Sequence, residues 1–400
     1  MEVRLRPTGP WRVGHPTGDK ERVDAIYRSD ALYSAITHAM RVLGWMEEWL
    51  DATARSENAP AVRFSSLFPF VGKTRLIAPP KTVATRMRLV PLEIARGATA
   101  EQGRWTADGA SQCLIPSGSP SPFHISVRSS AAIDRMTGAT EPHRTACLEF
   151  ASNAGWWGVF DAVDSKWETR VKSAFRLLAD SGFGGERSRG WGRSGEPSFS
   201  TASSLFPDCA ANGSWWLLSL YSPHDNDRVD WSKGNYSVIV RGGWTDSPAG
   251  TGLKKSVRMI EEGSVLQADA ARGKAVDVAP DGFAHPVYRS GFGLAVPLTS
   301  IAAPVPKIEN EQAQAPAAAE SEPSPPVEDV PATALDSSEE NEPAEPVAPV
   351  DPESAQREER SQPAEPPENV STAAFASSEE NGQAEEPGPP SPPVEGGREG

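Results

Sequence analysis

The sequence Gly-Phe-Gly-Gly-Glu-Arg-Ser-Arg-Gly-Trp-Gly-Arg occupies residues 182–193 and holds five glycines and three arginines. It follows a segment, from about Asp161 to Asp180, whose apolar residues recur at helical spacing, so a helix is expected to run into the glycines. Gly182 then suits the left-handed position just after a helix end. Glycine lets the backbone approach a ligand closely, and arginine binds phosphate through paired hydrogen bonds. The stretch therefore predicts a phosphate-binding loop, with an ordinary surface loop as the alternative.

Two familiar nucleotide-binding patterns occur by letter but lack the required context. Gly190-x-Gly192-x-x-Gly195 matches the dinucleotide fingerprint, which needs a strand before it and a helix after it, whereas here a helix precedes and Pro197 follows. Gly72-Lys73-Thr74 resembles the end of a Walker A loop, but Leu67 stands where its first glycine belongs. Neither pattern is interpreted as a nucleotide site, and no cofactor is expected.

The rest of the first 300 residues predicts a mixture of strands and helices. A helix is expected over 29–50, capped by Ser29 or Asp30, because apolar residues recur along one face. Residues 60–96 are basic and punctuated by proline, so an irregular segment is expected, and residues 97–122, rich in glycine and serine, are expected to be a mobile loop or an insertion. Short strands are expected at 1–14, 215–221, 236–241, 287–288 and 294–298. The apolar stripe of the first helix is Leu32, Ala35, Ile36, Ala39, Met40 and Leu43, and that of the second is Val163, Trp167, Val171, Ala174, Phe175 and Leu178. This layout favours an α+β fold with a split βαβ unit followed by a degenerate second one.

Charge divides the chain near residue 300. The formal net charge is −15, yet residues 301–400 hold 23 acidic and 4 basic residues, so the first 300 residues carry +4. The last hundred residues also hold 19 of the 38 prolines and only one aromatic residue, Phe375, which predicts a disordered, acidic, Pro-rich tail. The acidic total therefore does not exclude an anionic ligand for the first 300 residues. No apolar run is long enough to span a bilayer and no signal-peptide core is present, so a cytoplasmic protein without a membrane partner is expected.

Other candidate residues carry weaker signals. Lys254, Lys255 and Arg258 form a basic run that predicts phosphate contacts, with a solvated turn as an equal alternative, and Arg135 repeats the idea. His38 lies off the apolar stripe and is a candidate general base, although a solvated helix histidine is the more common case. No histidine or cysteine spacing predicts a metal site, and the three cysteines, Cys113, Cys147 and Cys209, are expected to be buried thiols.

The glycine stretch after a helix resembles the glycine-rich loop of the RAMP superfamily of CRISPR systems. The remaining resemblances occur in the expected order across residues 1–299, and together they point to the Cas5-group subunit of the type III-A (Csm) effector complex. They are Asp30–Ile36 for the first helix, Phe64–Phe70 after it, Ala132–Gly138 as the central IDRxTG stretch, and Leu218–Pro223, Arg241–Trp244, Glu261–Val265 and His285–Arg289 in the second half.

The resemblance implies two ferredoxin-like (RAMP/RRM-like) units with insertions. The expected organisation is a first unit at 1–200, with a thumb-like hairpin in the basic segment 60–96 and the glycine-rich loop, a second unit at 201–300, and the tail at 301–400. The resemblance further implies a non-catalytic subunit that binds the 5′ repeat-derived handle of crRNA through loop amides and arginines. The candidate RNA-binding residues are Gly182, Gly184, Gly185, Arg187, Ser188, Arg189, Gly190, Trp191, Gly192, Arg135, Lys254, Lys255 and Arg258.

The implied partners are the large polymerase-like signalling subunit and the backbone RAMP subunit, with target RNA contacted only indirectly. Three alternatives stay open from the sequence. The first is a metal-independent RAMP endoribonuclease that matures pre-crRNA with His38 as base, and the second is the equivalent subunit of a type III-B complex. The third is a purely structural assembly subunit whose RNA contact is incidental.

Overall fold

The computed structural model describes residues 1–298 except 15–17, 58, 102, 203–212 and 248–249. All described residues belong to one compact unit. The acidic segment 301–400 and Cys209 lie outside the described residues, so the tail expected to be disordered stays a prediction. The proposed division of the first 300 residues at position 200 also stays a prediction.

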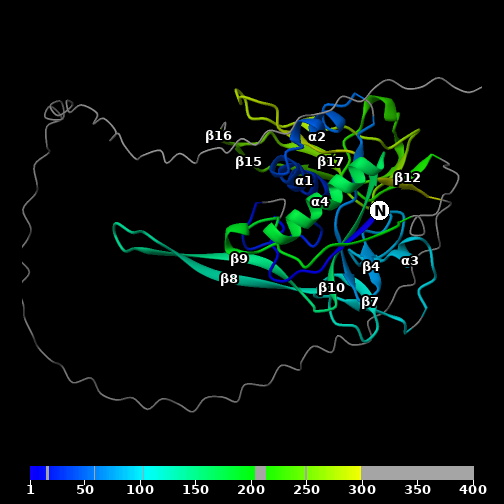
Figure 1. The fold of residues 1–400 in the computed structure, drawn as a ribbon. Helices are drawn as coiled ribbons and strands as arrows, with labels where there is room; N and C mark the ends of the chain where they lie inside the picture. Colours follow the sequence, from blue (N-terminus) through cyan, green and yellow to red (C-terminus); the bar gives the residue numbers. More distant parts are fainter. Residues whose placement is uncertain (15–17, 58, 102, 203–212, 248–249, 299–400) are drawn as a thin grey trace, which may run out of the picture. The chain divides into compact units, whose positions relative to one another are not determined.

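The N-terminal part is built on a seven-stranded antiparallel sheet (Figure 1). Its strand order is β11-β1-β10-β3-β4-β5, and β2 also pairs with β10. The first strand therefore lies between two strands that come much later in the chain, which ties the N-terminus into the centre of the sheet. The strands are β1 (Glu2–Leu5), β2 (Val62–Phe64), β3 (Phe68–Val71), β4 (Thr74–Ile77), β5 (Val90–Pro91), β10 (Ala154–Ala162) and β11 (Ser198–Ser200).

Two long helices, α1 (Ser29–Val42) and α4 (Ser165–Ser181), pack against each other beside this sheet (Figure 1). The predicted stripe of the first helix is confirmed, since its apolar side chains are buried or half-buried in the main core. The first helix is shorter than expected. It ends at Val42, where the N–H groups of Gly44 and Trp45 bond back to carbonyls of its last turns, and α2 (Met46–Ala52) follows.

The second helix starts later than the predicted Asp161, because β10 continues through Ala162. Asp164 caps the helix, and its Oδ1 accepts a hydrogen bond of 2.9 Å from the Trp167 N–H. Val163, expected on the buried side, is consequently outside the helix and 68% exposed. The other five residues of that predicted stripe are buried as expected.

Residues 60–122 are more ordered than predicted. The basic segment 60–96 holds four strands of the main sheet and a short helix, α3 (Leu92–Ala95), where an irregular segment was expected. The segment 97–122, expected to be a mobile loop or an insertion, contains an antiparallel hairpin of β6 (Trp105–Asp108) and β7 (Cys113–Pro116). The irregular segment and the mobile loop are wrong predictions, because strands of four residues or fewer, broken by proline and glycine, leave little periodicity to read.

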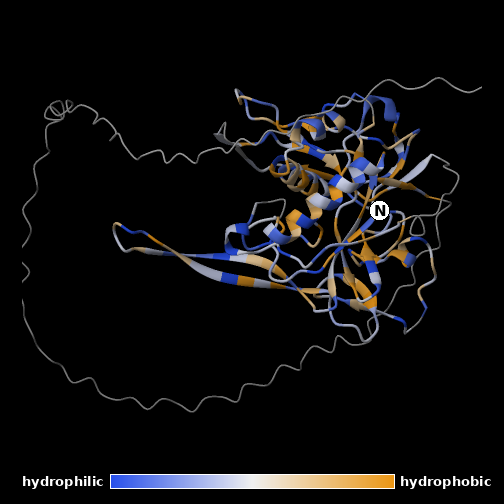
Figure 2. Ribbon diagram, in the orientation of Figure 1, coloured by the Kyte–Doolittle hydropathy of each residue, from blue (hydrophilic) through white to orange (hydrophobic). Residues whose placement is uncertain are grey.

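The longest hairpin joins β8 (Phe123–Ile133) to β9 (Thr140–Phe150), and Figure 1 shows both strands reaching far beyond the sheet. The structure thus places its extended hairpin here and not in the segment 60–96, where a thumb was expected. The stretch compared with IDRxTG forms its tip. Asp134 holds the turn there, since its carboxylate accepts from the Met136 N–H at 2.9 Å and from the Thr137 hydroxyl at 2.6 Å. Figure 2 shows apolar as well as polar residues along the hairpin, and Ile133 and Met136 are exposed.

The C-terminal part contains a smaller antiparallel sheet of order β13-β18-β12-β21 and three two-stranded pairs, β14-β17, β15-β16 and β19-β20. The predicted strands at 215–221, 236–241 and 294–298 correspond to shorter strands at nearly the same places, and the one at 287–288 to a strand of equal length shifted by one residue. The short helical turn η1 (Arg187–Arg189) comes before this part, and η2 (Asp225–Asp227) lies between β12 and β13. The strands are β12 (Ser214–Leu217), β13 (Asp230–Asn235), β14 (Val238–Arg241), β15 (Trp244–Ser247), β16 (Gly250–Leu253), β17 (Val257–Ile260), β18 (Val265–Gln267), β19 (Val276–Asp277), β20 (Tyr288–Arg289) and β21 (Ala295–Pro297).

The described residues thus form a mixed fold with many short strands and few helices, which confirms the α+β class in its coarse form. The main core gathers tryptophan, phenylalanine and aliphatic side chains from both parts, including Trp156 and Trp216. Among the helices of the described residues, we find none with the length and apolar character needed to cross a membrane.

Candidate nucleic-acid interface

The glycine-rich loop begins where α4 ends. Gly182 caps that helix with φ 81°, a left-handed conformation that disfavours other residues, and its N–H bonds to the Leu178 carbonyl at 2.8 Å. This confirms the predicted helix end. The chain then runs to the short turn η1 (Arg187–Arg189).

Most glycines of the loop allow its backbone to pack closely against other segments of the same chain. The Gly185 N–H donates to the Arg12 carbonyl at 2.9 Å, and the Gly192 N–H donates to the Pro10 carbonyl at 3.0 Å. A Cβ atom at Gly184 would lie 2.7 Å from the Arg12 carbonyl oxygen, and one at Gly192 would lie 2.1 Å from that of Phe183. These amides are therefore used within the chain, whereas the sequence had suggested that loop amides grip phosphate.

The tightly held glycines present the η1 turn to solvent. Arg187 and Ser188 are exposed, and no carboxylate among the described residues pairs with the Arg187 guanidinium. Gly190 is also exposed, with open space around the position of a Cβ atom. Trp191 is half-buried, and its role as a candidate RNA-binding residue stays a prediction.

Arg187 lies near α1. Partial burial, together with the charges of Arg187 and Arg41, lowers the pKa of His38 below its usual value. His38 is exposed, as expected from its place off the apolar stripe. The structure thus brings together two residues that the sequence had treated separately.

Arg189 has a different environment. Its Nη1 donates to the Ser130 hydroxyl at 3.0 Å, and its Nη2 lies 3.2 Å from His143 Nε2, which must accept because arginine has only donors. Ser130 and His143 are directly paired residues of the β8–β9 hairpin. Arg189 also pairs with Glu186 at 3.2 Å. Its charge is therefore engaged in joining the glycine-rich loop to the hairpin.

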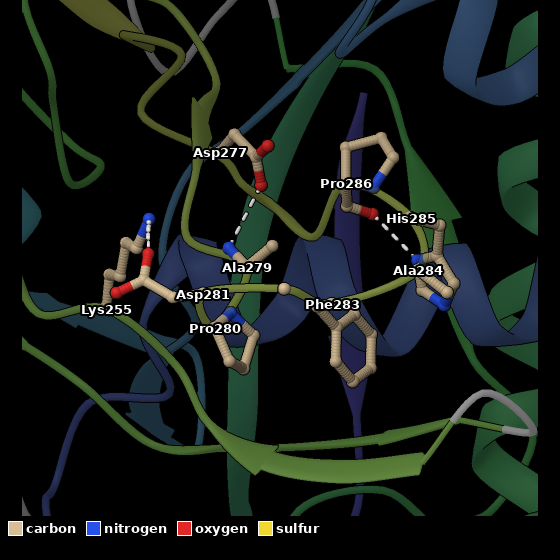
Figure 3. Close-up of a pocket in the computed structure, with 10 residues that line it drawn as sticks. Lys255, Asp277, Ala279, Pro280, Asp281, Phe283, Ala284, His285 and Pro286 are labelled. Carbon is tan, nitrogen blue, oxygen red and sulfur yellow. Dashed lines mark hydrogen bonds and ion pairs between the residues drawn. The ribbon is translucent and has the colours of Figure 1, made fainter.

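The remaining sequence candidates do not form one cluster. Arg135 lies at the exposed tip of the hairpin. Lys255 is exposed and pairs with Asp281 at 2.7 Å beside a pocket formed by the loop 277–286 (Figure 3). Lys254, its neighbour, is half-buried, and Arg258 is exposed on β17. The three cations of the basic run 254–258 therefore lie in three different environments, one half-buried, one paired with a carboxylate and one exposed on a strand.

Two buried groups of charges were missed by the sequence reasoning. Asp30, expected as a helix cap, is instead a fully buried ion-pair partner of Arg241 and Arg289, while the N-cap residue is Arg28, whose side chain makes no capping hydrogen bond. Arg28 itself pairs with Asp24, Glu261 and Glu262. A signal was present, because Asp30, Arg241, Glu261, Glu262 and Arg289 all fall within the stretches that carried the family resemblance.

No group of three or more potential metal ligands occurs in the part of the chain that the structure describes. Cys113 and Cys147 are buried free thiols, as expected. Burial raises the pKa of the Cys113 thiol to about 12, so it stays protonated near neutral pH.

Comparison with known proteins gives a domain match and a fold match. Residues 211–298 match the family model of the CRISPR Csm4 C-terminal domain. A chain of the Csm3-Csm4 subcomplex of a type III-A CRISPR-Cas interference complex superposes with a TM-score of 0.51 at 15% identity, over 74% of this chain and 99% of that one. None of the curated protein sequences compared with this chain matches it.

Two further solved structures superpose less well. They are a Csm1-Csm4 cassette in complex with cA3, with a TM-score of 0.43, 17% identity and coverage of 74% and 97%, and a type III-B Cmr-beta complex, with a TM-score of 0.40, 14% identity and coverage of 67% and 86%. Residues 211–298 are thus similar to the Csm4 C-terminal domain, and this match, together with the shared fold, supports the resemblance of the chain to the Cas5-group RAMP subunit of type III-A (Csm) CRISPR complexes.

Proposed function

We propose that this chain is a non-catalytic, crRNA-binding subunit of a type III-A CRISPR interference complex. It holds the 5′ repeat-derived handle of the guide RNA at the exposed η1 turn of the glycine-rich loop. It also joins the large signalling subunit to the backbone RAMP subunit and meets target RNA only through the guide.

One observation carries the proposed RNA contact. The Arg187 guanidinium is exposed and lacks a carboxylate partner among the described residues, at the outermost turn of a loop whose glycines are anchored by backbone hydrogen bonds. A fixed backbone that presents an unpaired guanidinium fits the bidentate geometry of a phosphate. Arg189 contributes through the hairpin that it orients, since its own charge is already engaged.

The fold supports the proposal through its first unit. Taken in chain order, β1, α1, β3, β10, α4 and β11 make a βαββαβ succession, and β1 lies between β10 and β11 in the sheet. We propose that this is the first ferredoxin-like unit and that residues 201–300 form the second. The Csm4 C-terminal domain lies within the second.

The partners follow from the resemblance. The solved structure with the same fold pairs Csm4 with Csm3, a type III-A complex component. We therefore propose a Csm3-type backbone subunit and a Csm1-type large subunit as the neighbours of this chain.

The test is RNA binding by the assembled complex. Arg187→Ala should weaken binding of handle RNA by about 1–3 kcal/mol, because a charge-assisted phosphate contact is lost. Arg176→Ala is the matched control, since this exposed arginine of the neighbouring α4 lies 3.6 Å from Glu196 and outside the loop. Equal affinities of the two variants for handle RNA would rule out the proposed contact.

A metal-independent endoribonuclease is the second candidate, favoured by the environment of His38. A lowered pKa keeps its imidazole neutral near pH 7, the form that a general base needs. Incubation of the purified chain with repeat RNA and EDTA separates the two functions. Cleavage that disappears in His38→Ala supports the nuclease, and a stable uncut complex supports the binding subunit.

A further inference from the structure

The first turn of α1 carries a buried group of charges that is not balanced. The Asp30 side chain is fully buried, and its carboxylate accepts from Arg241 Nε at 2.9 Å and Nη2 at 3.0 Å. Arg289 Nη1 donates to the same carboxylate, and its Nη2 donates to the Gly242 carbonyl at 3.0 Å. Two guanidinium groups from the C-terminal part thus share one carboxylate from the N-terminal part.

Arg289 retains an unused donor in this place. Only 9% of the residue is exposed, and its buried Nε has no hydrogen-bond partner among the described residues. A buried donor without a partner costs free energy unless a ligand or water supplies an acceptor. The arginine can therefore donate one more hydrogen bond, to a negatively charged or polar oxygen.

Lys254 adds a third cation. It is half-buried, and no carboxylate among the described residues pairs with its ammonium group. Its backbone N–H donates to the Gly243 carbonyl at 2.8 Å, next to the Gly242 carbonyl that accepts from Arg289, so the lysine lies beside this group. The group therefore contains three cations against one carboxylate.

The second buried group shows that such an excess is not general in this chain. Arg28, Arg88 and Lys81 face Asp24, Glu261 and Glu262, which are three cations against three carboxylates. That group closes on itself within the protein. Of these two groups, the Asp30 group is the one with an excess of two positive charges.

We infer that Arg241, Arg289 and Lys254 form a binding site for a phosphate of the guide RNA, held in the C-terminal part next to the glycine-rich loop. This inference rests on the proposed function and adds to it a second, separate contact. Arginine and lysine in one partly desolvated place are the residues that hold a phosphate anion. Asp30 orients the two guanidinium groups.

The location favours RNA over another anion. Tyr27 links the new site to the loop, since it stands three residues before Asp30 and its ring packs against that of Phe183, with the centroids 5.1 Å apart. The pKa of the Tyr27 phenol is raised by burial and by Asp30, and Arg187 and Arg241 oppose the rise. A single RNA strand that contacts Arg187 is thus within reach of Arg241, and neighbouring phosphates can occupy both places.

The experiment compares two adjacent lysines in the full chain. Lys254→Gln removes the unpaired cation of the site, and Lys255→Gln removes one that already pairs with Asp281. Affinity for handle RNA is measured by fluorescence anisotropy at several salt concentrations. Lys254→Gln should bind about tenfold more weakly, with the salt slope reduced by about one, whereas Lys255→Gln and Lys254→Arg should stay within about twofold of the parent. Thermal unfolding checks that all three variants fold.

The other outcomes separate this inference from the proposed function. Equal binding by Lys254→Gln and Lys255→Gln, with Arg187→Ala still weakened, overturns the inference and leaves the function standing. A parent chain that does not distinguish handle RNA from unrelated single strands overturns both. Binding of polyglutamate that is lost in Lys254→Gln, with RNA binding unchanged, overturns the inference in favour of an acidic protein partner. If inorganic phosphate competes with handle RNA for the parent chain but not for Lys254→Gln, the result supports an anion site of the stated chemistry.

Discussion

Arg28 Nη1 donates a hydrogen bond of 2.6 Å to Glu262 Oε2, between two side chains that are both almost completely buried and 234 positions apart in the chain. Glu262 also accepts from the Ser66 hydroxyl. This pair joins the start of α1 to the turn between β17 and β18. Charged residues thus form part of the contact between the two parts of the molecule, with hydrophobic packing around them.

Loss of one partner of this pair should destabilise the protein strongly. We expect Arg28→Met to lower the free energy of unfolding by about 3–5 kcal/mol, because three carboxylates then lose their shared buried cation. Arg55→Met is the control. Its guanidinium pairs with Glu47 and Asp51 at the surface, so the expected loss is below about 1 kcal/mol. Urea unfolding of the full chain measures both, and a loss for Arg28→Met no larger than the control would contradict the structural role.

Asp30 should contribute to acid unfolding. Burial alone would raise the pKa of Asp30, but the charges and hydrogen bonds of Arg241 and Arg289 hold it below the ordinary value of 3.8. A carboxyl group with a lowered pKa in the folded state stabilises the protein above its unfolded pKa, and this contribution is lost as the pH falls through the folded value. The urea concentration at the unfolding midpoint should therefore decrease as the pH falls below about 4. Asp30→Asn should start from a lower stability and show a smaller decrease over the same pH range. An unchanged pH dependence in Asp30→Asn would refute the assignment.

Arg189 should act by positioning the hairpin. Arg189→Ala removes the bonds to Ser130 and His143, so we expect faster hydrogen exchange in β8 and β9. Ser130→Ala should reproduce part of the effect. Arg187→Ala should leave hairpin exchange unchanged, since Arg187 makes no such bond. If Arg189 instead contacts a phosphate directly, Arg189→Ala should weaken RNA binding as much as Arg187→Ala does and leave hydrogen exchange in the hairpin unchanged.

Two glycines of the loop should differ sharply when replaced by alanine. Both have left-handed φ angles, 79° at Gly190 and 80° at Gly192, which cost alanine about 1–2 kcal/mol. Gly190 has open space around it, whereas a Cβ at Gly192 would lie 2.1 Å from the Phe183 carbonyl oxygen. We expect Gly192→Ala to cost on the order of 3 kcal/mol or more and Gly190→Ala only the conformational penalty. Similar unfolding midpoints for the two variants would show that the loop can move away from Phe183.

Local patterns predicted the parts of the fold that depend on neighbours in sequence. The α1 stripe and the end of α4 at Gly182 follow from helical spacing and from the conformational freedom of glycine. The four short strands within 60–96 could not be predicted in the same way, because β3 gains its place by pairing with β10, more than 80 residues later. Strand pairing at that distance leaves no periodic trace within a segment of three or four residues.

By itself, the sequence determined the α+β class, the helix that ends in a glycine-rich loop, and the family resemblance now supported by the match of 211–298. The tertiary structure decided which cations are available to a ligand. Arg187 and Arg189 are two residues apart, yet Arg189 pairs with Glu186, whereas Arg187 has no carboxylate partner among the described residues. Likewise, Lys255 pairs with Asp281, whereas its neighbour Lys254 is half-buried without a carboxylate partner among those residues. The reason is physical, since the charge that a side chain offers depends on its partners and burial, and residues distant in the chain supply both.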